Sequence, residues 1–148
     1  MRILNADGAV MRNLTGRPST TEETDAEWCH RLEERSDHER GLGYWAGWLE
    51  ASFVGWWGLG ACSWDPTTTN LGYRLMPAYW GEGLATEGSA SLLKHAFETA
   101  TMASVWASTT PQNWASQRVL TKLSMRYLGI QYGQCQYQIT SSEWANAN

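Results

Sequence analysis

The chain of 148 residues carries 11 Lys and Arg against 15 Asp and Glu, so its formal net charge is −4, and 43% of its residues are hydrophobic. This size suits one domain with one core, residues 1–148, and the charges include no basic cluster of the kind that binds nucleic acid. No run approaches the ~20 apolar residues of a membrane span. We therefore expect one cytoplasmic domain with neither nucleic acid nor membrane as its partner.

The three cysteines are Cys29, Cys62 and Cys135. They lie far apart, show no CxxC spacing and are odd in number. The sequence therefore predicts neither a disulfide framework nor a metal site.

Tryptophan is abundant, with ten residues in the chain. Because an indole buries a large area, we expect most of the ten in the core or in an interface, and one or two in a pocket. They are Trp28, Trp45, Trp48, Trp56, Trp57, Trp64, Trp80, Trp106, Trp114 and Trp144.

The first predicted element is a helix over residues 21–39. Thr20 and Glu23 match a capping box, in which each side chain bonds the backbone N–H of the other residue. The apolar face of this segment is thin, so the helix should cover an edge rather than form the core. That face consists of Trp28, Cys29 and Leu32.

Residues 42–77 change to a β pattern, with aromatic runs divided by glycines. The runs 42–50 and 52–64 are predicted to pair as a hairpin, and a turn over 65–70 leads to a third strand over 71–77. Connections this short join antiparallel strands.

A βαβ unit follows. Apolar residues recur at helical spacing over 84–99, and "SVWAST" at 104–109 is predicted as a buried strand. With the strand over 71–77, these elements form a unit whose two strands are parallel.

Residues 111–124 are predicted as a shorter helix, and residues 125–133 and 134–140 as a hairpin around Gly133. The fold class is α+β, an α/β three-layer arrangement whose sheet is mixed, mainly antiparallel and parallel at the central βαβ unit. The packing residues expected on the shorter helix are Trp114, Val119, Leu120 and Leu123.

The stretch "YRLMPAYWGEGLATEG" at 73–88 joins a strand of the βαβ unit to its helix. Glycines let the backbone approach a ligand without an intervening Cβ, and the first N–H groups of a helix have no intrahelical partners. Together with the helix dipole they predict an anion site, to which Thr86 could add a hydroxyl. The alternative is a tight connection without a ligand.

Three motifs carry a resemblance to a known family: "LGYRLMPAYWGEGLATEG" at 71–88, "PQNWASQRVLTKLSM" at 111–125 and "YQITSSEW" at 137–144. They resemble the GNAT superfamily of acetyl-CoA-dependent N-acyltransferases, in particular the branch of ribosomal-protein N-terminal acetyltransferases (RimJ and RimL). The likeness implies the GNAT fold, with acetyl-CoA (coenzyme A in its acetylated form) as cofactor and its pyrophosphate as the bound anion.

In the family, a six-residue pattern places Arg or Gln first, glycine fourth and glycine or alanine sixth. Trp80, Gly83 and Ala85 stand there, and the tryptophan suits this branch, where a WGxGxAT segment is usual. The resemblance implies that the strand over 73–76 splays from the strand over 104–109, with pantetheine in the gap as a pseudo-strand. The implied cofactor-binding residues are Leu75, Met76, Trp80, Gly81, Glu82, Gly83, Leu84, Ala85, Thr86, Asn113 and Ser116.

Acetyl transfer by direct attack of an amine needs a donor to the thioester oxygen and a proton for the leaving thiolate. The resemblance implies that backbone N–H groups near Leu75 and Met76 are the oxyanion donors. Asn113 matches a family asparagine that reaches the cofactor, and Ser116 matches a serine near the sulfur, which we expect to donate the proton. The tyrosine that many members use instead is Leu120 here. The alternative for Asn113 and Ser116 is helix capping.

No general base is predicted. Relatives often carry a glutamate where this chain has Asn70, whose amide accepts no proton at neutral pH. Asp65, Glu82 and Glu87 are near in sequence, but we expect them to be solvated surface charges, and a chain of waters could carry the proton to solvent.

Relatives usually begin with a strand and a helix before the segment that matches "NADGAVMRNL" at 5–14, and this sequence lacks the strand and most of the helix. The strand over 42–50 would then be an exposed edge, and bare edges invite pairing. We therefore expect a homodimer that covers this edge. Because the missing helix normally shapes the acceptor pocket, the acceptor itself is not predicted.

The predicted function is an N-acetyltransferase that acts in a ternary complex on a primary amine, either a small molecule or a protein (peptide) N-terminus. Trp45, Trp48 or Trp57 could hold its ammonium group by cation–π contact, although core packing is the favoured role. One alternative is an acyl-CoA-binding module without turnover, suggested by Asn70 and the short N-terminus. Another is a glycine-rich structural domain, which would make both motif matches coincidental.

Overall fold

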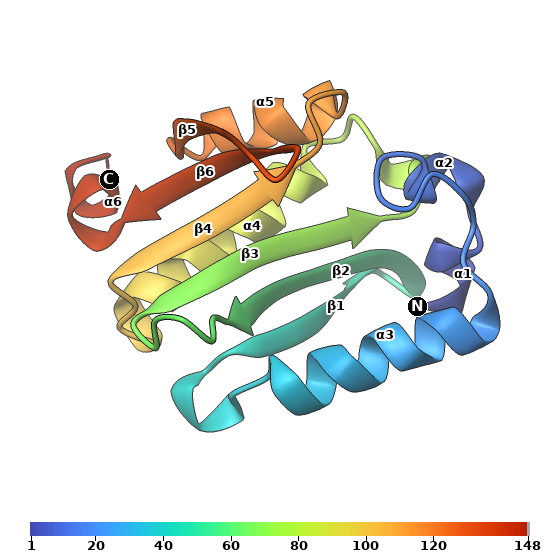
Figure 1. Cartoon of the computed structure of the whole chain (residues 1–148), viewed down its shortest axis with the longest axis horizontal. Coiled ribbons are helices and arrows are strands. Elements are labelled where there is room, and N and C mark those ends of the chain that lie inside the picture. Colours follow the sequence, from blue (N-terminus) through green and yellow to red (C-terminus); the bar gives the residue numbers. More distant parts are fainter. Residues whose placement is uncertain (148) are drawn as a thin grey trace.

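The computed structural model describes residues 1–147 and contains a six-stranded sheet with helices on both faces (Figure 1). The strand order is β1-β2-β3-β4-β6-β5. The strands are β1 (Gly43–Leu49), β2 (Ser52–Ala61), β3 (Thr68–Leu75), β4 (Ser104–Thr109), β5 (Arg126–Gln131) and β6 (Gln134–Thr140). The helices are α1 (Arg2–Asn5), α2 (Gly8–Met11), α3 (Thr21–Glu34), α4 (Leu84–Lys94), α5 (Trp114–Lys122) and α6 (Ser141–Ala147), with short helical turns η1 (His38–Arg40), η2 (Pro77–Tyr79) and η3 (His95–Thr99).

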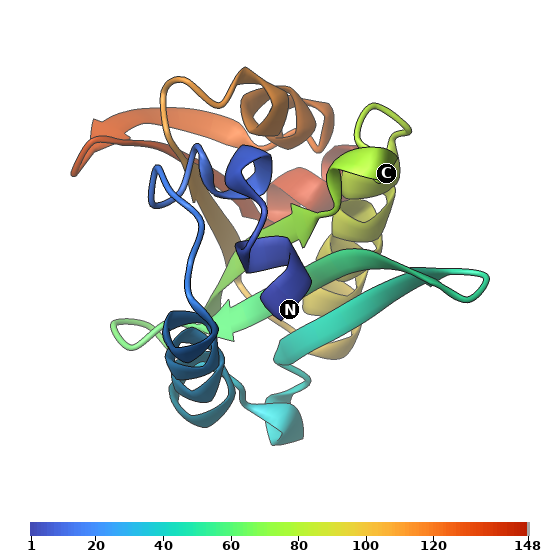
Figure 2. The same ribbon diagram turned by 90° about the vertical axis from the view of Figure 1, so that its right-hand side faces the viewer.

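The helices cover the sheet in two groups. α1, α2 and α3 lie on one side, which we call the α3 face, and α4 and α5 lie on the other, the α4 face (Figure 2). Trp28 of α3 packs edge-on against Trp56 of β2 with 5.3 Å between ring centroids, whereas Trp57 and Leu59 belong to the core beneath α4. Because successive strand residues point to opposite faces, the even-numbered residues of β2 from Trp56 onward face α3 and the odd-numbered ones face α4. A register shift opposite Gly47 and Trp48 reverses this order for Phe53 and Val54.

The sheet is mixed, as predicted. β1, β2 and β3 pair antiparallel, β3 and β4 pair parallel across α4, and β6 pairs antiparallel with both β4 and β5. The β5–β6 hairpin turns at Tyr132 and Gly133, whose φ values of 50° and 73° match the strand twist. The βαβ unit and both hairpins are therefore confirmed.

α3 begins as predicted and ends earlier. The Thr20 N–H donates to Glu23 Oε2 at 2.9 Å and the Glu23 N–H donates to Thr20 Oγ1 at 3.2 Å, which completes the capping box. The helix stops at Glu34, short of its predicted end. Asp37 starts a separate turn, because its carboxylate accepts the Arg40 N–H at 3.3 Å.

The start of β3 and the end of α4 also refine the prediction. β3 begins at Thr68, inside the segment 65–70 that was predicted as a turn. Asp65 accepts hydrogen bonds from the Thr67 N–H at 2.8 Å and from the Thr68 hydroxyl at 2.9 Å, so the turn closes sooner. The helix predicted over 84–99 consists of α4 and the π-helical turn η3.

β1 is an edge strand, because within the described chain it pairs only with β2. This confirms the exposed edge predicted for residues 42–50. The short helices α1 and α2 lie on the α3 face, where Leu4 and Met11 pack with Trp56. No helix in residues 1–147 is long and apolar enough to cross a membrane.

Half of the tryptophans are exposed in the single chain, so the expectation that most lie in the core or in an interface requires an interface. Trp57 is buried in the core as favoured, whereas Trp45 and Trp48 of β1 are 39% and 62% exposed. An edge strand has a neighbour on one side only, and its side chains extend beyond the cover of α3 and α4. The other exposed indoles are Trp64, Trp80 and Trp114, so Trp114 does not pack as expected, unlike Leu120 and Leu123 of the same segment.

A close contact fixes α4 on the sheet. A Cβ at Gly88 would lie 2.4 Å from the Trp57 ring, and a Cβ at Gly47 would lie 2.2 Å from Trp57 Cζ3. The indole therefore fits between two glycines. Its Nε1 also donates to the Ala85 carbonyl oxygen at 3.4 Å, which ties the first turn of α4 to β2.

Candidate active site

β3 and β4 separate along their length. Their parallel pairing is confined to residues 68–70 of β3 and 104–106 of β4. β3 nevertheless continues to Leu75 beside β2, and β4 continues to Thr109 beside β6 (Figure 1). Beyond their three pairs, the facing edges of these strands have no strand partner in residues 1–147. The predicted splay is therefore confirmed.

The Leu75 amide points into this gap. Opposite residues of an antiparallel pair alternate between hydrogen-bonded and non-bonded. The Met76 N–H donates to the Val54 carbonyl oxygen at 2.8 Å, so the preceding pair, Leu75 with Gly55, is non-bonded and its Leu75 amide faces β4. The Tyr73 amide faces β4 by the same alternation. The prediction of the Met76 amide as an oxyanion donor is wrong because this amide is engaged, whereas that of Leu75 stays a prediction.

The start of α4 presents backbone N–H groups that nothing caps. Gly83 is the N-cap residue with φ +82° and no side-chain cap, and the Glu87 N–H makes a helical bond to the Gly83 carbonyl oxygen at 3.0 Å. The N–H groups of residues 84–86 precede that bond. Gly81 shares the left-handed conformation with φ +82°, which favours glycine, and a Cβ on either glycine would meet no atom within 4 Å. Bare amides at the positive end of a helix, facing open space, suit an anion.

Trp80 forms hydrogen bonds with the end of β3 and the turn that follows it, rather than offering a donor to an anion. Its indole Nε1 donates to the Leu75 carbonyl oxygen at 2.9 Å, and its backbone N–H donates to the Pro77 carbonyl oxygen at 3.1 Å. The Trp80 amide is therefore already satisfied, and its predicted bond to phosphate is wrong. The amides open to an anion start at Gly81, and Glu82 contributes only its backbone because its side chain is exposed.

α5 begins with the predicted Asn113. This residue is the N-cap, and its Oδ1 accepts the Ser116 N–H at 3.2 Å. The capping role is therefore confirmed. The Asn113 side-chain amide makes no other hydrogen bond within the described chain, and its contact with the cofactor stays a prediction.

Ser116 has a partner that the sequence did not reveal. The Tyr73 hydroxyl donates to Ser116 Oγ at 3.1 Å, across 43 residues of sequence. Tyr73 lies on β3, beyond the last residue paired with β4 and next but one to Leu75. The only sequence feature that pointed to Tyr73 was its position in the "LGY" motif. That motif does not show which helix the tyrosine side chain contacts.

The state of Tyr73 suits proton donation. Burial raises the pKa of its hydroxyl above the ordinary value, and the hydrogen bond to Ser116 lowers it by less. The phenol is therefore protonated at neutral pH. Because Ser116 Oγ accepts the proton of Tyr73, the Ser116 hydroxyl can give its own proton to a third group.

The arrangement fits the acetyl-CoA that the resemblance implies. Pyrophosphate needs the N–H groups at the start of α4, and pantetheine needs strand-like partners, which the amides of Tyr73 and Leu75 provide. Thr110, which follows β4, has a buried Oγ1 without a hydrogen-bond partner. Buried hydroxyls are usually paired, so this atom also favours a ligand near the end of β4.

The structure gives no evidence that Asp65, Glu82 or Glu87 is the general base. Asp65 closes the turn before β3, and hydrogen bonds from Thr67 and Thr68 lower its pKa. Glu82 and Glu87 are exposed. Asn70 is half-buried at the last pair between β3 and β4.

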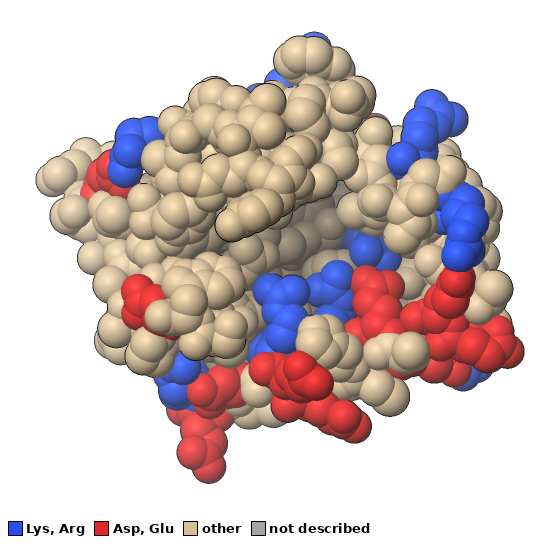
Figure 3. All heavy atoms as spheres, viewed as in Figure 1, with Lys and Arg blue, Asp and Glu red and all other residues tan. Residues whose placement is uncertain are grey.

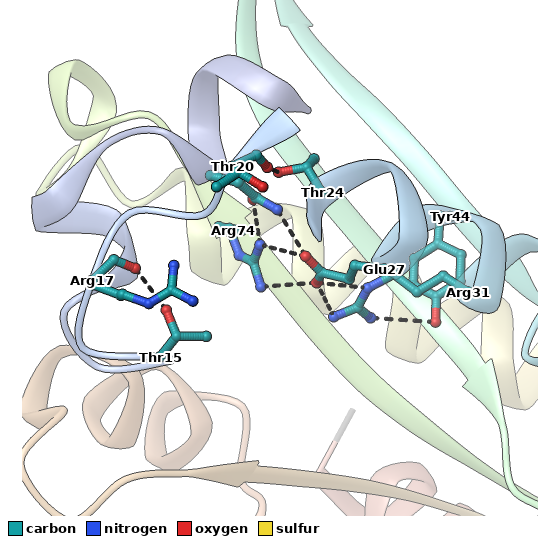
Figure 4. A network of polar contacts seen from close by, with 9 residues as sticks. Thr15, Arg17, Thr20, Thr24, Glu27, Arg31, Tyr44 and Arg74 are labelled. Atoms are coloured by element: carbon teal, nitrogen blue, oxygen red, sulfur yellow. Dashed lines mark hydrogen bonds and ion pairs between the residues drawn. The ribbon is translucent and has the colours of Figure 1, made fainter. Parts of the chain in front are cut away.

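An ion network that sequence reasoning missed lies between α3 and β3 (Figure 4). Glu27 Oε1 accepts from Arg31 at 2.9 Å and from Arg74 at 3.2 Å, while Asn5 donates to Glu27 Oε2 at 2.7 Å and accepts from Arg74. Burial raises the pKa of Glu27, but the two guanidiniums outweigh it, so the net pKa is lowered. The network fastens α1 and α3 to the strand that borders the gap.

Comparisons with known proteins agree with this geometry. A family profile described as an acetyltransferase (GNAT) domain matches residues 1–126. The FsC-acetyl coenzyme A-N(2)-transacetylase of Aspergillus fumigatus is 33% identical over 165 residues, a match that covers 95% of this chain and 68% of that protein.

Solved structures share the fold. Spermidine N-acetyltransferase from Vibrio cholerae, in complex with CoA and spermine, has a TM-score of 0.76 at 13% identity, over 98% of this chain and 90% of that one. Mycobacterium smegmatis RimJ, in complex with CoA-disulfide, has a TM-score of 0.67 at 20% identity, over 88% of this chain and 65% of that one. Such identities show the fold alone, while the profile and the fungal relative show the family and confirm the resemblance carried by the motifs. The chain belongs to the GNAT acetyltransferase family, whose cosubstrate is acetyl-CoA.

Proposed function

We propose that the protein transfers the acetyl group of acetyl-CoA to a primary amine within a ternary complex. The gap between β3 and β4 carries this proposal, because it lies between the uncapped start of α4 and the Tyr73–Ser116 pair. The fungal relative is named an N(2)-transacetylase and the Vibrio protein a spermidine N-acetyltransferase, so both are named for nitrogen acceptors. We expect a small-molecule amine or a protein N-terminus as acceptor, in the cytoplasm, without nucleic acid or membrane as partner.

The residues along the gap divide the work. The N–H groups from Gly81 to Thr86 hold the pyrophosphate, and the Leu75 amide donates to the thioester oxygen as negative charge develops there. The amine nitrogen bonds to the carbonyl carbon while the carbon–sulfur bond breaks, and the nitrogen then loses one proton to solvent to give the neutral amide. Ser116 then gives its proton to the departing thiolate. Tyr73 gives its own proton to Ser116, and solvent later returns a proton to Tyr73.

The amine must be unprotonated when it attacks. Asn70 accepts no proton, so in this proposal the ammonium proton leaves to solvent through water on the α3 face. The acceptor enters from that face, because α4 and α5 cover the other side of the gap.

The alternative is an acyl-CoA-binding module without turnover, which Asn70 favours. A thiol-release assay over a panel of primary amines separates the two, with acetyl-CoA affinity measured in parallel by titration calorimetry. We expect thiol release above hydrolysis together with an acetylated product by mass spectrometry. Tight binding without release for every amine would establish the module, and absence of binding would reject both.

We also propose a homodimer formed at β1. Its outer edge is unpaired in the described chain, and its Trp48 and Leu49 are 62% and 53% exposed, which favours strand pairing. Light scattering at micromolar concentration should give twice the chain mass of 16.6 kDa. Trp48→Lys should give a monomer, whereas Trp64→Lys, at another exposed indole, should not. A monomeric wild type would reject this proposal.

A further inference from the structure

The α3 face is hollowed over the middle of the sheet, where β3 runs beside the gap (Figure 3). α3 covers the β1–β2 side of this face and leaves the hollow open. Gly58, Gly60 and Gly72 occupy positions of β2 and β3 that face this side. A Cβ at Gly58 would lie 2.3 Å from the Tyr44 ring, so Tyr44 covers that position, whereas the half-buried backbone of Gly72 forms part of the floor beside the gap.

Arg35, at the end of α3, covers the floor of the hollow at Gly60. Its guanidinium atoms would be 2.6–2.9 Å from a Cβ at Gly60. Gly60 pairs with Asn70 and Asn70 pairs with Trp106, so the guanidinium lies at the level of the sheet where the gap begins. Within residues 1–147, the Arg35 side chain makes no hydrogen bond and no ion pair.

Three guanidiniums lie beside the hollow. Arg31 and Arg74 share one carboxylate, that of Glu27 (Figure 4), and Arg35 adds a third guanidinium. Basic and acidic side chains both border this side of the hollow (Figure 3). Arg74 is only 8% exposed, and its pKa is lowered by burial and further by the like charge of Arg31, while Glu27 raises it. The indole N–H of Trp56, in the same layer, is buried without an acceptor. Of the three guanidiniums only that of Arg35 has no ion-pair partner in residues 1–147, and an unpaired guanidinium suits an anion.

We propose that the acceptor amine carries a carboxylate, which Arg35 binds in the hollow while the amine points into the gap. This inference rests on the proposed function, since it names the class of acceptor for the same site. A guanidinium holds a carboxylate by two parallel charge-assisted hydrogen bonds, which also fix its orientation.

The register sets the length of the acceptor. Asn70, beside Arg35, and Tyr73, beside the reacting group, are three residues apart on β3, which is roughly 10 Å at 3.3 Å per residue. An amine and a carboxylate separated by a flexible chain should therefore fit better than those of glycine.

The test uses pairs of acceptors in which a neutral amide replaces the carboxylate: glycine, 4-aminobutanoate and 6-aminohexanoate, each against its methylamide. We expect the wild type to prefer 6-aminohexanoate over its methylamide by about 10- to 100-fold in kcat/KM, with a smaller preference for glycine. Arg35→Gln should remove this preference, and Arg35→Lys should keep part of it. Lys122→Gln, an equal change of charge on α5, should leave it intact.

A second readout needs no turnover. The product 6-acetamidohexanoate, titrated into protein without CoA, should bind the wild type at least about tenfold more tightly than Arg35→Gln, with circular dichroism confirming that the variant is folded.

Equal use of the carboxylate and the methylamide, or an Arg35→Gln variant that keeps the preference, would overturn this inference while the proposed function stands. Failure of every amine in the thiol-release panel would overturn the proposed function. In that case, Arg35-dependent binding of 6-acetamidohexanoate would still support the carboxylate site, and its absence would reject it.

Discussion

Replacing Gly83 with valine is expected to raise the Kd for acetyl-CoA by at least about 100-fold while the sheet stays folded. The Gly83 side faces open space and makes no contact that the fold needs, so the isopropyl group would occupy the place proposed for the pyrophosphate. The φ of +82° adds a strain of about 1–2 kcal/mol for any L side chain. Titration calorimetry measures the affinity, and thermal unfolding measures the strain.

Gly16→Val is the matched control, because Gly16 has φ +78° and equally open surroundings. It should lower the melting temperature by a similar amount and leave acetyl-CoA affinity unchanged. If Gly83→Val bound acetyl-CoA like the wild type, the start of α4 would not be the phosphate site. If both variants lost affinity together, backbone strain rather than lost contact would be responsible.

Ser116→Ala is expected to lower kcat by about 100-fold and to change acetyl-CoA affinity by less than about twofold. A general acid acts chiefly in the transition state, where it contributes 10²–10⁴-fold. Tyr73→Phe should lower kcat by less, because Ser116 still has its own proton to donate and loses only the hydroxyl that would return a proton to it. The helix start should survive both changes, since Asn113 caps the backbone N–H of residue 116 rather than its side chain.

The double variant separates a relay from two independent effects. If Tyr73 acts through Ser116, the double variant should be no slower than Ser116→Ala alone, whereas independent roles would multiply. Tyr132→Phe, at a fully exposed hydroxyl in the β5–β6 turn, should leave the kinetics unchanged. A Tyr73→Phe variant with wild-type turnover would remove Tyr73 from the mechanism.

The parts of the structure that local sequence determines could be predicted. The capping box at Thr20, the two-residue turn at Gly133 and the βαβ unit depend on residues close together in the chain, and all three are present. The family motif around Gly83 also indicated the uncapped helix start, because it reports backbone conformation directly.

Contacts between distant residues could not be predicted in this way. Periodicity places Tyr73 on a face of β3 but does not show that Ser116 lies opposite, 43 residues later. The engagement of the Met76 and Trp80 amides depends on register and on the turn after β3, which residue types do not reveal. The exposure of Trp45 and Trp48 follows from their place on the edge strand β1, whereas Trp64, Trp80 and Trp114 lie outside the strands, and composition alone does not predict either position.

Trp57, seated between Gly47 and Gly88, couples two positions of the chain through one ring. Any added methyl at residue 88 would lift α4 away from β2 and carry the first turn of that helix with it, because the same indole bonds the Ala85 carbonyl oxygen. A residue larger than glycine at position 88 therefore leaves the start of α4 in place only if a residue smaller than tryptophan stands at position 57. The two positions should vary as a pair, although neither would touch the substrate.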